Sequence, residues 1–200
     1  MNPGACPPFD NGLQGKQLER DFLCDVVRNR HNAAILERWG QLALPDAWLV
    51  AGCLFQSIWN LQLGRPPDAG IKDYDLFYFD PHDLSEAGER KAQAAVDRLF
   101  ADLAISVEVA NQARVHDWYP AYFGRPYPAL KSSKDGIKRF LVLETCVGVR
   151  PEGCHAPYGL EGIYAGTLTS NPLTPYPELF ERKVASYQSR WPHLCVVPHS

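Results

Sequence analysis

The sequence predicts an α/β or α+β domain, in which a small mixed β-sheet is flanked by helices. Short apolar runs typical of buried strands alternate with segments of helical period, and no internal repeat or low-complexity tract interrupts them. The chain has 200 residues, of which 46% are hydrophobic and 12% aromatic, enough for one domain with a sizeable core. We therefore expect a flexible arm rich in Pro, Gly and Asn over 1–15, a single domain over 16–191 and a Pro-rich, frayed tail over 192–200.

The first half of this domain shows two helices followed by a strand, a helix and a second strand. Apolar residues recur near the 3.6-residue period over 16–39, which predicts the two helices. The apolar run Trp48–Ala51 is typical of a buried strand, and helical period returns over 53–63. A loop rich in Gly and Pro over 64–70 then leads into the aromatic run Asp73–Asp80, which predicts the second strand.

The second half of the domain is expected to add further helices and strands. The predicted elements are a helix over 85–103, a strand over 105–109 that can run on towards Val115, a short helix over 136–140, a strand over 141–149 and a final helix over 177–190. Ser132 followed by Asp135 resembles a capping box ahead of the short helix. Pro177 stands at the first turn of the final helix, where a proline is tolerated.

Charge, hydropathy and cysteine usage exclude several classes of protein. A net charge of −3 is not typical of a general nucleic-acid binder, so we do not expect extended nucleic-acid binding. No apolar stretch of about 18 residues predicts a membrane span, and the N-terminus shows no secretory signal. The six cysteines are scattered without a CxxC pair, which favours free thiols over a disulfide framework or a zinc site. These observations together predict a cytoplasmic protein.

Two aspartates at the start of the second strand are the main candidate for a functional site. Side chains alternate between the faces of a strand, so Asp73 and Asp75 project from the same face. Two adjacent carboxylates repel each other, and a hard cation such as Mg²⁺ (or Mn²⁺) relieves that repulsion through oxygen ligands. Glu108, between two valines on the next strand, completes the site if the two strands pair. Asp73, Asp75 and Glu108 are thus the predicted metal ligands and catalytic residues.

The spacing Asp-x-Asp is common, and on its own it usually marks a solvated face or a turn. Here the aspartates begin an aromatic strand, follow a helix opened by Gly52, and precede an isolated acid. Backbone N–H groups of Gly52 and Cys53, at the start of that helix, are suited to hold phosphate. The alternative is a plain strand-to-helix turn, and the sequence leaves both open.

Cationic and aromatic side chains supply further candidates for nucleotide binding. Arg114 and His116 follow Glu108 by even steps and would share its face if the strand stayed extended, with Arg114 contacting phosphate or substrate. A basic cluster surrounds the predicted short helix and contacts a triphosphate, contacts an anionic acceptor or is a solvated face: Lys131, Lys134, Lys138 and Arg139. Trp59 is expected in the core, whereas Tyr119 and Tyr122 are candidates for walls of the site.

This order of motifs resembles the DNA polymerase beta-like nucleotidyltransferase superfamily. Its members carry a Gly-Gly or Gly-Ser turn that opens a helix, then an Asp-x-Asp strand, then a third acid on a later strand. The turn here is Gly52-Cys53, and the acids are Asp73, Asp75 and Glu108. The layout is also similar to the head of tRNA CCA-adding enzymes. Cys53 departs from the pattern, because it stands where the superfamily has a second Gly or Ser.

The match to a bacterial nucleotidyltransferase-like family, formerly a domain of unknown function, covers roughly residues 20–190. It rests on Gly52-Cys53-Leu54, on Ile71-Lys72-Asp73-Tyr74-Asp75-Leu76-Phe77-Tyr78-Phe79-Asp80, on Val107-Glu108-Val109 and on the run Asn111–His116. The resemblance implies the polymerase beta-like fold and a metal-dependent transfer of a nucleoside monophosphate from NTP to an unidentified acceptor. That acceptor would be a small molecule, an RNA end or a protein side chain.

Two other functions are compatible with the same residues. One is a catalytically inactive nucleotide-binding or regulatory module, because a fold does not by itself establish an activity. The other is a metal-dependent phosphodiesterase, since clustered acids also serve hydrolysis. Retention of three acids argues against the first, and the Gly52 turn directly before the aspartates favours transfer over hydrolysis.

Overall fold

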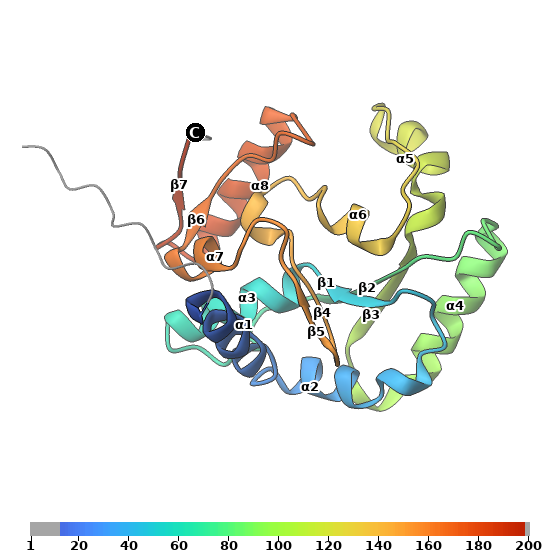
Figure 1. The fold of residues 1–200 in the computed structure, drawn as a ribbon, viewed down its shortest axis with the longest axis horizontal. Helices are drawn as coiled ribbons and strands as arrows, with labels where there is room; N and C mark the ends of the chain where they lie inside the picture. Colours follow the sequence, from blue (N-terminus) through green and yellow to red (C-terminus); the bar gives the residue numbers. More distant parts are fainter. Residues whose placement is uncertain (1–12, 199–200) are drawn as a thin grey trace, which may run out of the picture.

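A five-stranded mixed sheet forms the centre of the computed structural model, which describes residues 13–198 (Figure 1). The strand order is β3-β2-β1-β4-β5. The strands are β1 (Trp48–Val50), β2 (Asp73–Tyr78), β3 (Ser106–Asn111), β4 (Gly148–Arg150) and β5 (Gly153–His155). Only β2 and β3 are parallel to each other, and the other neighbours in this sheet are antiparallel. The predicted mixed sheet is therefore confirmed.

Helices cover this sheet on both sides. They are α1 (Leu13–Val26), α2 (Arg30–Glu37), α3 (Gly52–Gln62), α4 (Glu86–Leu99), α5 (Val115–Phe123), α6 (Ser133–Ile137), α7 (Glu161–Ala165) and α8 (Pro177–Arg190). In Figure 1, α2 and α4 lie below the sheet, whereas α5, α6 and α8 stand above it. A second, two-stranded parallel sheet joins β6 (Thr167–Leu168) to β7 (Cys195–Val196).

The alternation of side chains along β2 separates the two faces of the sheet. Tyr74, Leu76 and Tyr78 are buried, and the first two belong to the larger core, which also contains the apolar residues of α3. On the opposite face a smaller core forms where Trp48 and Val50 pack against Ile137 of α6. Asp73, Asp75 and Phe77 alternate with the buried residues, so they face the side of α6.

Helix α4 is the crossover that makes β2 and β3 parallel neighbours. The Oγ of Ser85 caps its N-terminus by accepting a hydrogen bond from the Gly88 N–H at 3.0 Å. Its Gln93 side chain donates to the Val107 carbonyl at 2.7 Å and accepts from the Val109 N–H at 2.9 Å. These two bonds satisfy backbone groups on the outer edge of β3, which has no strand neighbour there.

The predicted extension of the third strand towards Val115 is wrong, because β3 ends at Asn111. The Asn111 Oδ1 accepts hydrogen bonds from the N–H groups of Asp80 and Ala113, and its Nδ2 donates to the carbonyls of Asp80 and Asp83. This side chain holds the chain in a tight turn, and α5 begins only four residues later. Helix α5 forms with Pro120 inside it.

The predicted fourth strand over 141–149 is also largely wrong, since only Gly148–Arg150 pair in the sheet. Before them a short 3₁₀ turn forms, in which the Thr145 hydroxyl donates to the Val142 carbonyl at 2.8 Å. The predicted cap at Ser132 is confirmed, because its Oγ accepts from the Asp135 N–H at 3.3 Å. The final helix has its predicted bounds.

The structure tests the predicted N-terminal arm and C-terminal tail to different extents. Most of the predicted N-terminal arm lies outside the described residues, but Leu13 to Gly15 already belong to α1. The predicted frayed tail over 192–200 is corrected as far as Val197, whose N–H donates to the Leu168 carbonyl at 3.1 Å. Leu194, only 1% exposed, anchors this segment in the larger core. Within residues 13–198, no helix combines the length and apolarity needed to cross a bilayer.

Candidate active site

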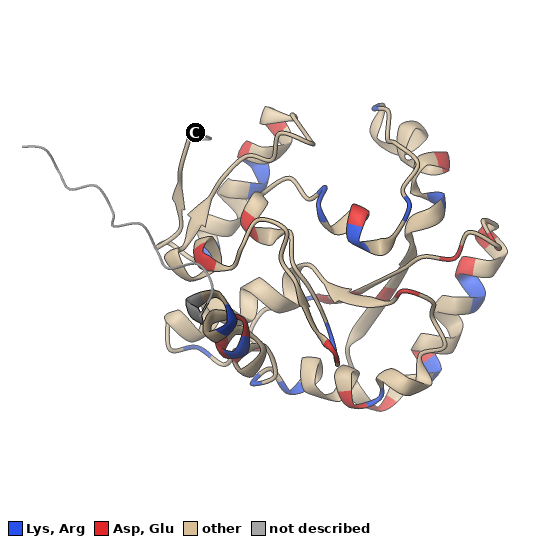
Figure 2. Cartoon of the chain, viewed as in Figure 1, with Lys and Arg blue, Asp and Glu red and all other residues tan. Residues whose placement is uncertain are grey.

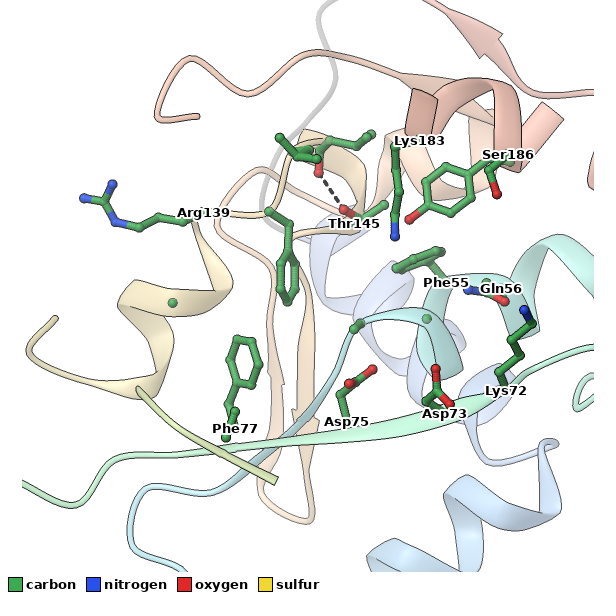
Figure 3. Close-up of a pocket in the computed structure, with 18 of the residues that line it drawn as sticks. Phe55, Gln56, Lys72, Asp73, Asp75, Phe77, Arg139, Thr145, Lys183 and Ser186 are labelled. Carbon is green, nitrogen blue, oxygen red and sulfur yellow. Dashed lines mark hydrogen bonds between the residues drawn. The ribbon is translucent and has the colours of Figure 1, made fainter. Parts of the chain in front are cut away.

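A pocket of about 740 Å³ opens on the α6 side of the sheet, a volume that suits a nucleotide-sized ligand. Residues from β2, from the start of α3, from α5, from the segment after α6 and from α8 line it. The pocket therefore lies between α5 and α8, which stand on either side of α6 in Figure 1. Asp73, Asp75 and Phe77 are in its lining (Figure 3), and so is Gly52.

Strand β2 orders the parts of this pocket along one line. Asp73, Asp75 and Phe77 share one face, and each step of two residues advances about 6.6 Å. Strand β1 runs antiparallel beside it with Val50 opposite Asp75, so the turn that follows β1 lies at the Asp73 end. The line therefore begins at the start of α3, passes the aspartates and ends at Phe77.

The turn between β1 and α3 is sharp. Ala51 has φ +62° and ψ −140°, a conformation that is strained for a residue with a side chain and is tolerated most often at functional sites. Gly52 then opens α3, whose first N–H groups have no partner within the helix. A Cβ at Gly52 would lie 2.5 Å from the Gln56 Nε2, so any larger residue here would displace the end of that side chain. Such a helix start attracts anions.

Cys53 contributes only its backbone to this turn. Its side chain is fully buried, and its Sγ donates to the Val50 carbonyl at 3.3 Å. Burial raises the pKa of the Cys53 thiol well above its ordinary value, and the Asp75 carboxylate acts in the same direction. The thiol therefore stays neutral in the core, where a polar serine hydroxyl would need a partner.

The third predicted acid lies beside the aspartate pair. In the parallel pairing of β2 and β3, Glu108 is directly opposite Asp75, and both face the α6 side. Burial raises the pKa of Asp75 to about 6; Glu108 and then Asp73 add to this effect, and Lys183 opposes it. Glu108 therefore acts on the site through its charge, because it contributes to the raised pKa of Asp75. The Glu108 side chain itself is exposed and does not line the pocket.

The donor chemistry of these acids fits a hard divalent cation. Three carboxylates share one face of two neighbouring strands, and after burial their mutual repulsion is the next cause of the raised pKa of the middle one. As the side chains stand, no three His, Cys, Asp or Glu of the described range converge closely enough to hold a metal ion. Rotation of Glu108 and Asp73 towards Asp75 is therefore required for a three-acid site.

Helix α8 contributes the main group of site residues that sequence reasoning missed. Lys183, Ser186, Tyr187 and Arg190 follow one another at helical spacing, so one face of α8 lines the pocket. Lys183 points into the pocket towards Asp75 (Figure 3), and burial lowers its pKa, with Arg190 adding to the effect. Arg190 donates to the Gln56 Oε1 at 3.2 Å, which ties α8 to the start of α3.

Two predicted nucleotide contacts lie elsewhere. The Arg114 side chain pairs with Glu89 of α4 and donates to the Leu84 carbonyl, so it is absent from the pocket lining. The reason is the turn at Asn111, which ends the extended conformation that the prediction required. Lys138 is also outside the lining and lies 3.8 Å from Asp135, while the neighbouring Arg139 lines the pocket.

Aromatic residues form the side of the pocket opposite to α8. Trp118 and Tyr119 of α5 line it together with Tyr127, which sequence reasoning missed. Tyr122 was predicted as a wall residue, but it is 77% exposed and outside the lining. Trp59 is fully buried, which confirms its predicted place in the core.

Comparison with known proteins agrees with this arrangement. The chain has the polymerase beta-like nucleotidyltransferase fold, and it is similar to an NMR structure described as a CCA-adding enzyme head domain, with 25% sequence identity. That match has a TM-score of 0.72 and covers 92% of this chain and 96% of the other. The chain belongs to a nucleotidyltransferase family, whose model matches residues 37–196. No curated protein is detectably similar to the chain.

Proposed function

We propose that this protein transfers a nucleoside monophosphate from an NTP to an acceptor hydroxyl and releases pyrophosphate. The observation that carries the proposal is that three features line one pocket. They are the start of α3 at Gly52, the two aspartates of β2, and the face of α8 that carries Lys183 and Arg190. Mg²⁺ or Mn²⁺ would be held by Asp73, Asp75 and Glu108. When bound, such an ion neutralises phosphate charge and polarises the acceptor hydroxyl.

The phosphate tail is expected at the Asp73 end of the pocket. The first N–H groups of α3 point their partial positive charge there, and Lys183 and Arg190 add two cations from α8. Desolvation at the pocket lowers the pKa of both side chains, although Lys183 remains accessible to solvent and Arg190 is half-buried, so both can reach a bound phosphate. Family membership agrees with an NTP as the donor.

In the proposed reaction the acceptor oxygen forms a bond to the α-phosphorus, while the bond from that phosphorus to the α,β-bridging oxygen breaks. The electron pair leaves with pyrophosphate, which Lys183 and Arg190 stabilise. The hydroxyl proton passes to the Glu108 carboxylate, which stands next to Asp75 and remains open to solvent. Attacking and leaving oxygens lie roughly in line across the α-phosphorus.

The test is incubation of the full chain with each α-phosphate-labelled NTP, Mg²⁺ or Mn²⁺ and a cell extract. A labelled product together with released pyrophosphate supports the proposal and identifies the class of acceptor. Nucleotide binding without pyrophosphate release would instead indicate an inactive binding module. Hydrolysis of nucleic acid without added NTP would indicate a phosphodiesterase.

Substitution of Lys183 tests the role of α8 in donor binding. We expect Lys183→Gln to raise the KM for the NTP about tenfold, because one charge-assisted phosphate contact, worth about 1.5 kcal/mol, is lost. Arg182→Gln is the matched control, since Arg182 is exposed on the same helix and does not line the pocket. Equal KM values for the two variants would exclude Lys183 from donor binding.

A further inference from the structure

The pocket has a second end whose chemistry differs from that of the phosphate end. We call it the aromatic end, and its residues are Phe77, Trp118, Tyr119, Tyr127, Arg139 and Phe140. Figure 3 shows Phe77 and Arg139 on one side of Asp75, with Lys183 and Gln56 on the other. Among the described residues of the aromatic end, Arg139 is the single charged side chain.

Ring contacts join these residues into two groups, which the chain neighbours Arg139 and Phe140 bring together. The Phe77 and Phe140 rings lie 5.6 Å apart, and the Arg139 guanidinium lies 5.8 Å from the centre of the Tyr127 ring. Tyr127 in turn packs on Tyr119 at a centroid distance of 4.4 Å. Such a surface favours a flat, apolar ring, which can stack on its faces and edges.

The geometry of the proposed reaction assigns this end to the acceptor. Along β2 the phosphate end lies beside Asp73, and Phe77 lies beyond Asp75 on the same face. Pyrophosphate leaves towards the start of α3, so an in-line attack must come from the opposite side of the aspartates. The sugar and base of the donor branch away from this axis, because the ester oxygen that carries them is not in line with the leaving group.

We propose, on the basis of the function proposed above, that the aromatic end binds the acceptor and that this acceptor is a small molecule with a hydroxyl group close to an aromatic ring. A nucleic-acid acceptor is disfavoured, because backbone tracking needs a row of cations and, of the basic residues near this end, only Arg139 lines the pocket. Figure 2 shows basic residues on α6 and in the segments on either side of it, together with an acidic residue on α6 itself, and of these only Arg139 lines the pocket.

A binding experiment on the full chain tests this assignment without requiring turnover. The probes are 4-(2-hydroxyethyl)phenol, which carries a ring, and 1,2-propanediol, which carries none, each followed by saturation-transfer NMR with and without saturating MgATP. We expect the ring probe to bind, the diol not to bind, and binding of the ring probe to persist with MgATP. Displacement of the ring probe by MgATP would mean that the donor base occupies this end and would overturn the assignment, as would equal binding of the diol.

The variant Tyr119→Ala locates the bound ring. We expect it to weaken binding of the ring probe at least about fivefold, since one stacking contact is removed. Tyr122→Ala is the matched control, because Tyr122 belongs to the same helix but is 77% exposed and outside the pocket. Tyr119→Leu preserves apolar packing against Phe123 and Tyr127 and gives the same test if the alanine variant loses helix α5. Unchanged affinity in a folded Tyr119 variant contradicts the proposal.

A turnover assay with the same probes separates the two proposals. Absence of a labelled product with every acceptor, including the extract, overturns nucleotidyl transfer, whereas the ring-binding result is measured independently. Transfer to the diol or to an RNA 3′ end at the same rate as to the ring probe leaves nucleotidyl transfer in place and overturns the assignment of the acceptor.

Discussion

Replacement of Asp75 by asparagine is expected to lower kcat/KM for nucleotidyl transfer by at least about 10³-fold, because the variant loses the charge at the centre of the acid cluster. Asp75 lies between Asp73 and Phe77 on the pocket face and directly opposite Glu108. Of the three acids, only Asp75 is placed next to both others, two residues from Asp73 along β2 and opposite Glu108 in the strand register, so a remaining pair cannot replace it. Asp75→Ala is expected to give the same loss while the chain stays folded.

The control for this prediction is Asp80→Asn. Asp80 lies two residues after the end of β2, and it does not line the pocket. Steady-state kinetics with labelled NTP measure both variants, and NTP binding in EDTA, which depends on the helix start and α8, is expected to survive in both. Retention of more than about a tenth of the activity by Asp75→Asn would contradict a central role in transition-state stabilisation.

The aspartate pair was predictable because its geometry is local. Alternation along a strand alone places Asp73 and Asp75 on one face, and aromatic residues marked that strand. The prediction that Glu108 joins the aspartates required its strand to pair with β2. The sequence alone does not determine which strands pair. The structure shows this pairing with Glu108 in register with Asp75.

The cationic side of the pocket was not predictable in the same way. Lys183 and Arg190 lie more than 100 residues after the aspartates, and only tertiary packing brings α8 over them. Their seven-residue spacing on a correctly predicted helix was the available signal, since it places both on one face. The prediction for Arg114 was wrong because it assumed that the strand of Glu108 continues to Arg114. The Asn111 side chain forms a turn between these two residues, and the strand ends there.

The raised pKa of Asp75 has a consequence for stability. An aspartate ordinarily titrates near 3.8, whereas burial and then the charges of Glu108 and Asp73 raise the pKa of Asp75 to about 6 in the folded chain. Between these two values the folded state binds more protons than the unfolded state, so this group makes the free energy of unfolding fall as the pH rises from about 4 to 6. Above about pH 6 the carboxylate is ionised in both states, so it lowers the free energy of unfolding by an amount that no longer changes with pH.

Asp75→Asn is therefore expected to be more stable than the natural chain at pH 8 in EDTA, by about 2 kcal/mol, because two pKa units correspond to about 2.7 kcal/mol and the amide recovers less than all of it. At pH 4, where Asp75 is protonated in the folded chain, the two free energies of unfolding should nearly coincide. Mg²⁺ at pH 8 should stabilise the natural chain, because a bound cation offsets the repulsion between the ionised Asp75 carboxylate and its acidic neighbours. The variant lacks that carboxylate, so its stability should not change. Urea unfolding at both pH values measures these differences, with Asp80→Asn as the control. A variant less stable than the natural chain at pH 8 would show that the ionised Asp75 carboxylate stabilises the fold. That result would contradict the proposal that the three acids form a cation site.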